Sequence, residues 1–279
     1  MVDRAQRGAL DLVPLQSIHP HELADPAREE RIERRLAMDG VLRDPLIVGT
    51  VPRLDGYVLL DGTNRLQALK SLGLERGLVQ VIDYSGAGTV SLRTWCHSTP
   101  MPFESLAARS ARIPGVAVEP IAELGAADAL AMHSTVAVLL GKDRIAALTR
   151  VEEYPHSRAE QLRALVDLYQ HSMTRVDGDP TNIEELAQSM CESPSGELTL
   201  VAFPPITRSQ VVTMAMRGVL IPAGITRHVI LEGRALRVNV PLEMLRDTGS
   251  LDDAREALER HLSGLQPRLY REPTILYDS

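Results

Sequence analysis

The chain has 279 residues, which suggests roughly two domains at the usual size of about 150 residues each. Hydrophobic residues make up 44% and charged residues 24%, which excludes intrinsic disorder for the bulk of the chain. The 30 basic side chains stand against 37 acidic ones, a formal charge of −7, so the basic excess typical of a DNA-binding domain is missing. Aromatic residues are only 3%, which argues against a single-strand nucleic-acid binder built on aromatic stacking.

Cysteine content and hydropathy exclude further classes of protein. Cys96 and Cys191 are far apart and form no C-x-x-C pair, so neither a zinc ribbon nor a dithiol redox site is indicated. Ligation of haem or a metal by Cys96, His97 and Cys191 is an alternative, although lone Cys and His residues are more often structural. The N-terminus has no apolar signal region, and no apolar run approaches the ~18 residues of a membrane span. We therefore expect a soluble cytoplasmic protein that does not contact a membrane.

The first 88 residues predict an alternation of strands and helices. Strands are expected at residues 11–18, 46–48, 57–60 and 78–84. Helices are expected at residues 27–38 and 66–72, each followed by a glycine that would cap its C-terminal end. The strand at 57–60 is continuously apolar, as strands buried on both faces are. Residues 85–88 are typical of a hinge, so a domain boundary is expected near residue 88.

The pattern is less regular from residue 89 onward. Strands are expected at 89–97 and 198–203, helices at 158–170, 208–217 and 251–264, short helices or strand–helix pairs at 103–112, 121–130 and 142–149, and a loop at 173–182. Residues 225–240 predict a hairpin with its turn at Glu232-Gly233, and Pro241 is expected to start a helix. The predicted fold class is α+β, with an N-terminal domain at 1–88 and a mixed α/β C-terminal domain at 89–279.

The strongest local signal is Asp61-Gly62-Thr63-Asn64-Arg65, which connects a buried strand to a helix. Exposed N–H groups at a helix start favour anions, and Gly62 lets the backbone approach a phosphate closely. Arg65 adds a forked donor for phosphate oxygens, and Asp61 could hold a magnesium ion beside them. The alternative is a plain strand–helix connection in which Thr63 or Asn64 is the N-cap.

Residues 11–84 resemble the ParB/sulfiredoxin fold. The resemblance is carried by Val13-Pro14-Leu15, by residues 40–48 and by residues 57–73, whose core is a glycine-x-x-arginine motif after an aliphatic strand. Thr63 stands where sulfiredoxins carry a nucleophilic cysteine, and no helix-turn-helix follows as it does in chromosome-partitioning members. A narrower branch fits better, namely the free L-serine kinases, which include the kinase of staphyloferrin-type siderophore clusters.

Three features of the chain resemble those kinases. His21-Glu22 follows the first strand, where the kinases carry their catalytic glutamate, and Trp95 follows the first domain, where a tryptophan helps enclose serine. Gly224-Ile225-Thr226-Arg227-His228 is similar to their glycine-x-threonine-arginine-histidine segment, which contacts the substrate. Thr63-Asn64 stands where a His-His pair is common, so no histidine role is carried over to that turn. Residues 98–200 carry little that matches.

The resemblance implies a kinase that phosphorylates free L-serine to O-phospho-L-serine with Mg²⁺ and ATP or ADP, for cysteine, diaminopropionate or siderophore synthesis. It implies Glu22 as the general base, because a serine hydroxyl gains from a positioned proton acceptor. Asp61 becomes the metal ligand or a second acid–base group, and the phosphate cradle consists of Gly62, Thr63, Asn64 and Arg65. Serine is then held by Trp95, Thr226, Arg227 and His228, with the Arg227 guanidinium suited to the carboxylate.

A ParB-like DNA-binding regulator of a biosynthetic gene cluster is the main alternative, and a nuclease is a weaker one. The regulator needs a basic face, for which the helix at 27–38 offers Arg28, Arg31, Arg34 and Arg35. Glutamates interleave with these arginines, as is typical of a solvated helix face. A P-loop kinase is excluded because Asp143 follows Gly141-Lys142, and protein-kinase motifs are absent. The sequence leaves the nucleotide donor and the oligomeric state open.

Overall fold

The computed structural model describes residues 9–52, 54–121, 125–151, 157–178, 183–191, 198–246 and 249–268. The chain divides into two compact units, and both are discontinuous in sequence. Unit 1 comprises Met1–Pro20, Ala24–Ser91 and His228–Ser279, and unit 2 comprises His21–Leu23 and Leu92–Arg227. The boundary expected near residue 88 lies close to the crossing at Ser91. The expected second domain at 89–279 differs from the structure, because the chain returns to unit 1 at His228.

Unit 1 is built on a five-stranded sheet with the strand order β1-β6-β4-β5-β2. Its strands are β1 (Ala9–Pro14), β2 (Ile18–His19), β4 (Leu46–Thr50), β5 (Tyr57–Asp61) and β6 (Arg76–Asp83). The pairs β4–β6 and β2–β5 are parallel, whereas β1–β6 and β4–β5 are antiparallel. Val58 and Leu59 of β5 are fully buried, which confirms the burial predicted for this apolar strand.

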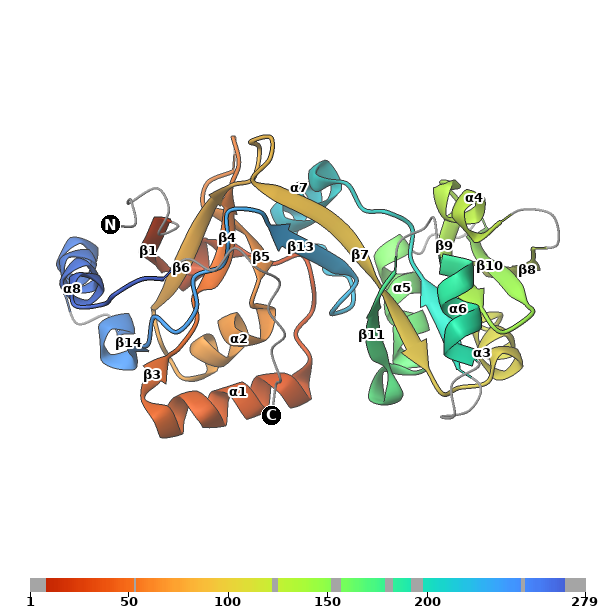
Figure 1. The fold of residues 1–279 in the computed structure, drawn as a ribbon, viewed down its shortest axis with the longest axis horizontal. Helices are drawn as coiled ribbons and strands as arrows, with labels where there is room; N and C mark the ends of the chain where they lie inside the picture. Colours follow the sequence, from red (N-terminus) through yellow and green to blue (C-terminus); the bar gives the residue numbers. More distant parts are fainter. Residues whose placement is uncertain are drawn as a thin grey trace. The chain divides into compact units, whose positions relative to one another are not determined.

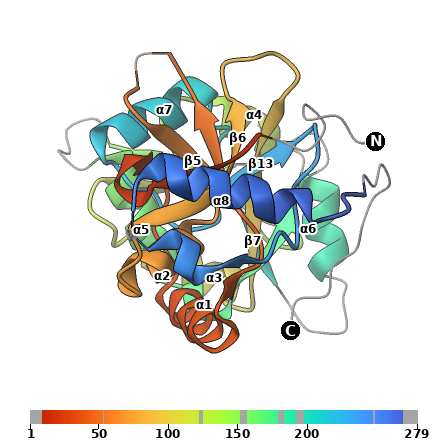
Figure 2. The ribbon, with the colours of Figure 1, turned by 90° about the vertical axis from the view of Figure 1, so that its left-hand side faces the viewer.

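Three helices pack against the sheet of unit 1, and their bounds are α1 (Pro26–Asp39), α2 (Thr63–Ser71) and α8 (Leu251–Ser263). The Asp25 carboxylate caps the N-terminus of α1, and Gly40 ends it with a φ of 67°, as the sequence predicts. Helices α1 and α2 lie side by side next to the sheet (Figure 1), and α8 packs along the edge strand β1 (Figure 2). Leu36, Leu66 and Leu258 bring the three helices into one hydrophobic core.

The C-terminal residues belong to unit 1 because they complete its core. Val240 and Leu245 are fully buried there together with Leu258. The short strand β14 (Val240–Pro241) pairs with β3 (Val41–Leu42), and the 3-10 helix η4 (Leu242–Leu245) follows at the place where Pro241 predicts a helix.

Unit 2 is built on a second sheet in the order β11-β7-β12-β9-β10-β8, with β13 paired to β7. The strands of this sheet are β7 (Val90–Thr99), β8 (Val116–Pro120), β9 (Thr135–Leu140), β10 (Ile145–Arg150), β11 (Thr174–Asp177), β12 (Thr199–Ala202) and β13 (Thr226–Ile230). The first two residues of β7 and the last three of β13 belong to unit 1. The helices of unit 2 are α3 (Phe103–Ser110), α4 (Ala126–Ala131), α5 (Arg158–Asp167), α6 (Ile183–Cys191) and α7 (Arg208–Arg217). Strands β9 and β12 are buried along their whole length, because α3 and α5 contribute to the core on one face and α4 and α6 on the other.

The hairpin predicted at 225–240 is wrong in its second half. β13 forms, but residues 235–239 are not a strand. Arg237 and Asn239 have φ angles of 56° and 53°, a left-handed conformation outside the β region. Side chains of unit 1 accept hydrogen bonds from backbone N–H groups of this segment. The Asp44 carboxylate, for example, accepts from the Arg237 N–H.

Two other elements differ from the predictions. Residues 145–150 form the strand β10, where a short helix or a strand–helix pair is expected. Residues 174–177 form β11 within the expected loop at 173–182, of which residues 179–182 lie outside the described part of the chain. Among the described residues, no helix is long and apolar enough to cross a membrane.

Candidate active site

The turn between β5 and α2 has the geometry of an anion site. Gly62 has a φ of 105°, and a Cβ atom here would lie 2.8 Å from Leu46 Cδ2 and 3.1 Å from Arg65 Nη2, so only glycine fits. Gly62 is the N-cap of α2 and provides no side-chain cap, unlike the alternative in which Thr63 or Asn64 caps the helix. The N–H groups of the first turn of α2 therefore donate no hydrogen bond to an N-cap side chain, which is the condition under which a helix start binds anions.

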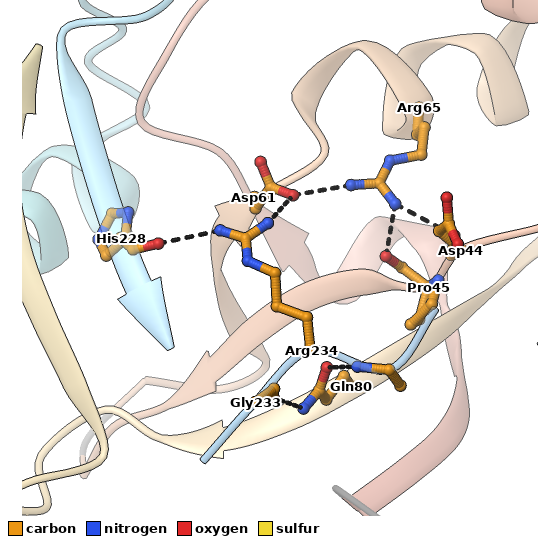
Figure 3. Close-up of polar contacts among 9 residues, drawn as sticks. Asp44, Pro45, Asp61, Arg65, Gln80, His228, Gly233 and Arg234 are labelled. Atoms are coloured by element: carbon orange, nitrogen blue, oxygen red, sulfur yellow. Dashed lines mark hydrogen bonds and ion pairs between the residues drawn. The ribbon is translucent and has the colours of Figure 1, made fainter. Parts of the chain in front are cut away.

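Asp61 lies between two guanidinium groups (Figure 3). Arg65 Nη2 donates to Asp61 Oδ2 at 2.8 Å, and Arg234 Nη1 donates to the same oxygen at 2.9 Å. Burial on its own raises the pKa of the Asp61 carboxyl, but the two guanidiniums outweigh this effect, and the pKa is lowered. Two positive charges against one negative charge leave a net positive charge at the turn, which favours a phosphate.

Backbone carbonyls fix both guanidiniums. Arg65 Nη1 donates to the carbonyl oxygen of Pro45 at 2.7 Å and of Asp44 at 3.2 Å. Arg234 Nη2 donates to the carbonyl oxygen of His228 at 3.0 Å. Sequence reasoning missed Arg234, because it lies far from the turn in the chain and belongs to no motif. The one sequence signal for Arg234 is its position directly after Gly233, in a predicted turn.

Two other predicted residues of unit 1 have structural contacts. Asn64 Oδ1 accepts a hydrogen bond from the Asp25 backbone N–H at 2.7 Å, so this amide links the starts of α1 and α2. His228, predicted to hold serine, is buried, and its Nε2 is 2.9 Å from the Tyr84 hydroxyl. His228 thus lies in the same unit as Asp61 and in a different unit from Trp95, Thr226 and Arg227.

Glu22 is held by the segment that precedes β13. The Gly224 N–H donates to Oε2 at 3.0 Å, and the Ile225 and Thr226 N–H groups donate to Oε1 at 3.1 Å and 2.6 Å. The Thr226 hydroxyl also donates to Oε1, at 2.7 Å. Oε1 therefore has three donors and Oε2 one, so Oε2 keeps more capacity to receive a proton.

His21 extends this arrangement through Thr226. Because the Thr226 hydroxyl gives its hydrogen to Glu22, its oxygen accepts from His21 Nε2, 2.9 Å away. The backbone of this segment is fixed as well, since Leu23 N–H donates to the Ile221 carbonyl and Ile221 N–H donates to the His21 carbonyl. The predicted base and the predicted serine-binding threonine thus lie in direct contact.

Gly224 is held from three directions in unit 2. Its φ is 78°, and a Cβ atom here would collide with the Arg175 guanidinium. Its N–H donates to Glu22, and its carbonyl accepts from His97 Nε2 at 2.9 Å. A carbonyl only accepts, so Nε2 carries the proton, and Nδ1 accepts from the Tyr169 hydroxyl at 3.1 Å. Burial lowers the pKa of His97 to about 4, so its ring is neutral at pH 7.

The haem or metal alternative finds no support in this part of the protein. Both ring nitrogens of His97 are used within the chain, and burial raises the pKa of the Cys96 thiol to about 12. The side chain of Cys191 lies outside the described part of the structure. Over the described ranges, no three His, Cys, Asp or Glu side chains gather as metal ligands do.

Trp95 and Arg227 form a second pair in unit 2. The Arg227 guanidinium carbon lies 4.4 Å from the centroid of the Trp95 ring, and the guanidinium also pairs with Asp177. Thr226 and Arg227 are consecutive residues of β13, so their side chains project to opposite faces. Sequence reasoning missed Asp177, because it falls in the segment predicted as a loop.

Comparisons with known proteins agree with the resemblance seen in the sequence, although no family model matches the chain. The chain is 26% identical over 248 residues to the ATP-dependent L-serine kinase SbnI of Staphylococcus aureus, covering 88% of this chain and 87% of that protein. Over 84 residues it is 33% identical to the ATP-dependent L-serine kinase of Staphylothermus marinus, covering 30% of this chain and 33% of the relative. The chain is thus similar along most of its length to a protein named as an ATP-dependent L-serine kinase.

Solved structures show the same mixed α/β fold. The structure of SbnI with a C-terminal truncation matches with a TM-score of 0.69 at 22% identity, over 91% of this chain and 96% of that one. A free serine kinase in complex with AMP matches with a TM-score of 0.69 at 20% identity, over 85% of this chain and 93% of that one. The mixed α/β character of the fold is confirmed, the named relatives support the predicted resemblance to free L-serine kinases, and the ParB/sulfiredoxin-like domain stays a prediction.

Proposed function

We propose that the protein transfers the γ-phosphoryl group of ATP to the hydroxyl of free L-serine, giving O-phospho-L-serine and ADP. The observation that carries the proposal is the similarity, along 88% of the chain, to a protein named ATP-dependent L-serine kinase. Free serine kinases of the same fold are known in complex with AMP and with ADP, which supports a nucleotide as ligand.

The nucleotide phosphates are assigned to the turn from Asp61 to Arg65. The uncapped start of α2, the close backbone approach at Gly62 and the net positive charge support this assignment. The domain that carries the turn is taken to be ParB/sulfiredoxin-like, on the sequence pattern of residues 11–84. A cytoplasmic location and a product used in amino-acid or siderophore synthesis belong to the same proposal.

Asp61 also fits a magnesium ion. Mg²⁺ is usually bound by one or two carboxylates together with substrate phosphates rather than by a cage of protein ligands. Both arginines contact Asp61 through Oδ2, so Oδ1 is the oxygen that would hold the ion. When bound, Mg²⁺ supplies neutralisation of phosphate charge.

Glu22 is proposed as the base and the β13 region as the serine site. The serine Oγ forms a bond to the γ-phosphorus, the bond from that phosphorus to the bridging oxygen breaks, and ADP leaves with the electron pair. The hydroxyl proton passes to Glu22, whose position is set by Gly224, Ile225 and Thr226. Thr226, Arg227 and Trp95, with His228, are proposed to hold serine, and the Arg227 guanidinium would exchange its Asp177 partner for the serine carboxylate.

The comparisons favour this kinase over the DNA-binding regulator. The helix that would have to supply a basic face is α1, and two of its arginines pair with acidic side chains one turn away. Arg34 pairs with Glu30 at 3.9 Å, and Arg35 pairs with Asp39 at 3.8 Å. This is the solvated helix face that the interleaved charges predict.

Incubation with L-serine, Mg²⁺ and either ATP or ADP, followed by phosphorus NMR, tests the proposal. We expect an O-phosphoserine resonance with ATP, and none when L-serine is replaced by L-alanine, which lacks the hydroxyl. Absence of phosphoserine with ATP would overturn the proposal. Sequence-specific DNA binding by the same preparation would then favour the regulator.

A further inference from the structure

A buried glutamine controls the backbone on both sides of Arg234 (Figure 3). Gln80 lies on the central strand β6 with only 1% of its surface exposed. Its Oε1 accepts from the Ala235 N–H at 2.9 Å, and its Nε2 donates to the Gly233 carbonyl at 2.9 Å. One side-chain amide therefore binds the two residues that flank Arg234.

The burial of Gln80 requires an explanation, because a polar side chain inside a central strand is unfavourable unless it is hydrogen-bonded. Its neighbours on β6, Val79 and Val81, are apolar, as expected for this position. The Gln80 amide donates to the Gly233 carbonyl and accepts from the Ala235 N–H, so both of its polar atoms are hydrogen-bonded. The hydrogen bonds replace the strand pairing that residues 235–239 lack, and they set the point from which the Arg234 side chain leaves the backbone.

Arg234 keeps donors for a ligand. A guanidinium has five N–H donors, and the hydrogen bonds of Arg234 to Asp61 Oδ2 and to the His228 carbonyl use two of them. The Arg234 side chain is 40% exposed, so the remaining donors are accessible to a ligand. Planar, forked donors of this kind suit phosphate oxygens.

We propose that Arg234 is a second phosphate-contacting arginine of the nucleotide site, beside Arg65, and that Gln80 is the residue that positions it. The inference rests on the proposed function, since it takes the nucleotide phosphates to lie at the turn from Asp61 to Arg65. It adds a residue from the far C-terminal part of unit 1 and a buried positioning residue, neither of which belongs to the motif at the turn.

Calorimetric titration with ATP and with adenosine tests the role of Arg234. We expect Arg234→Gln to weaken ATP binding by about 10-fold or more, because a charge-assisted hydrogen bond is lost, and to leave adenosine binding unchanged. Arg237→Gln is the matched control, since it removes the same charge from an exposed arginine of the same segment. ATP affinity unchanged in Arg234→Gln, or lowered equally in both variants, would overturn the assignment.

A double-mutant comparison tests whether Gln80 acts through Arg234. Gln80→Met keeps the length of the side chain and removes both hydrogen bonds, so ATP binding should weaken in the same direction as in Arg234→Gln. In the Arg234→Gln background it should add nothing, and an additive loss would show a merely structural role. Gln161→Met is the control, because Gln161 is a buried glutamine of unit 2 whose amide donates to the Gly115 carbonyl. If Gln80→Met does not fold, Gln80→Asn, whose shorter amide does not reach both partners, takes its place.

The outcomes separate this inference from the proposed function. If the unaltered protein forms phosphoserine and binds ATP while Arg234→Gln binds ATP equally well, only the inference fails. If the unaltered protein neither binds ATP nor forms phosphoserine, the proposed function fails and the inference fails with it.

Discussion

Glu22 is interpreted either as a structural anchor or as the general base, and experiment separates the two interpretations. Four hydrogen bonds from Gly224, Ile225 and Thr226 converge on its carboxylate, so it anchors the start of β13 whatever its chemistry. A carboxylate that only anchors affects stability, whereas a general base affects turnover. The two interpretations differ at Oε2, which accepts a single hydrogen bond and receives the hydroxyl proton if Glu22 is the base.

Replacement of Glu22 by glutamine distinguishes them. We predict that Glu22→Gln lowers phosphoserine formation by about 10²–10⁴-fold, because an amide does not accept the hydroxyl proton. ATP binding should persist, since the phosphates are assigned to unit 1. Glu232→Gln, at an exposed glutamate, is the control for the change in charge. Turnover near that of the unaltered protein, with a lowered unfolding midpoint, would leave Glu22 as an anchor only.

Gly224 offers a test of the same region that does not depend on catalysis. Gly218 and Gly224 both have a positive φ, but a Cβ atom at Gly218 meets nothing within 4 Å, whereas one at Gly224 collides with Arg175. We predict that Gly218→Ala lowers the free energy of unfolding by about 1 kcal/mol. Gly224→Ala should cost about 1–3 kcal/mol more, because the collision adds to the strain. Equal losses in urea unfolding would show that Arg175 gives way freely.

The site residues differ in whether the neighbouring sequence is enough to predict them. The turn from Asp61 to Arg65 could be predicted, because a strand, a glycine and a helix start are contiguous in the sequence. Glu22 and Thr226 could be identified as site residues only through the resemblance to a family. Their contact depends on the tertiary fold, because the two residues are far apart in the sequence. Asp177 carries no local signal, and Arg234 carries only its position after Gly233, because their partners lie in distant segments of the chain.

At the scale of elements, β7 supports the Glu22 segment through a buried histidine. His97 contacts the Gly224 carbonyl on one side and the Tyr169 hydroxyl on the other, and it is fully buried. Burial lowers its pKa to about 4, although the Gly224 carbonyl favours the charged form. The folded protein therefore holds His97 neutral at pH values where an unfolded histidine, with a pKa near 6.5, already binds a proton.

This difference predicts a pH-dependent contribution to stability. Because the folded-state pKa is the lower one, the contribution is complete above about pH 6.5 and is lost as the pH falls towards 4. The full loss amounts to about 3 kcal/mol in the free energy of unfolding. His97→Gln keeps a donor for Gly224 and does not titrate. The difference in unfolding free energy between the two proteins should shrink from pH 7 to pH 4, and a constant difference would contradict the lowered pKa.

Most helices and strands could be predicted, because their signals are local. The helix expected at 27–38 is α1 (Pro26–Asp39), and its glycine cap is where the sequence places it. The second strand of the expected hairpin at 225–240 could not be predicted correctly, because Gln80 and Asp44 bind its backbone in place of a partner strand. The strand β11 could not be predicted either, because its pairing with β7 is a long-range contact.

At the scale of the molecule, unit 1 is assembled from the two ends of the chain. The Leu231 N–H donates to the Thr89 carbonyl at 3.0 Å, so the chain leaves unit 1 and returns to it at adjacent points. Burial of a valine or leucine side chain contributes about 1.5–3 kcal/mol. Val240, Leu245 and Leu258 are all buried in the core of unit 1, so their combined contribution is comparable with the whole stability of a small domain.

We therefore predict that residues 1–91 do not fold alone, whereas residues 1–91 joined to residues 228–279 by a short glycine linker do. The joined chain should unfold cooperatively in urea, monitored by circular dichroism, because it restores the core around Leu258 and the pairing of β14 with β3. It should bind ATP in calorimetry, since it contains Asp61, Arg65 and Arg234. It should form no phosphoserine, because Thr226 is removed with unit 2. Cooperative unfolding of residues 1–91 alone would contradict the assignment of the C-terminal segment to this unit.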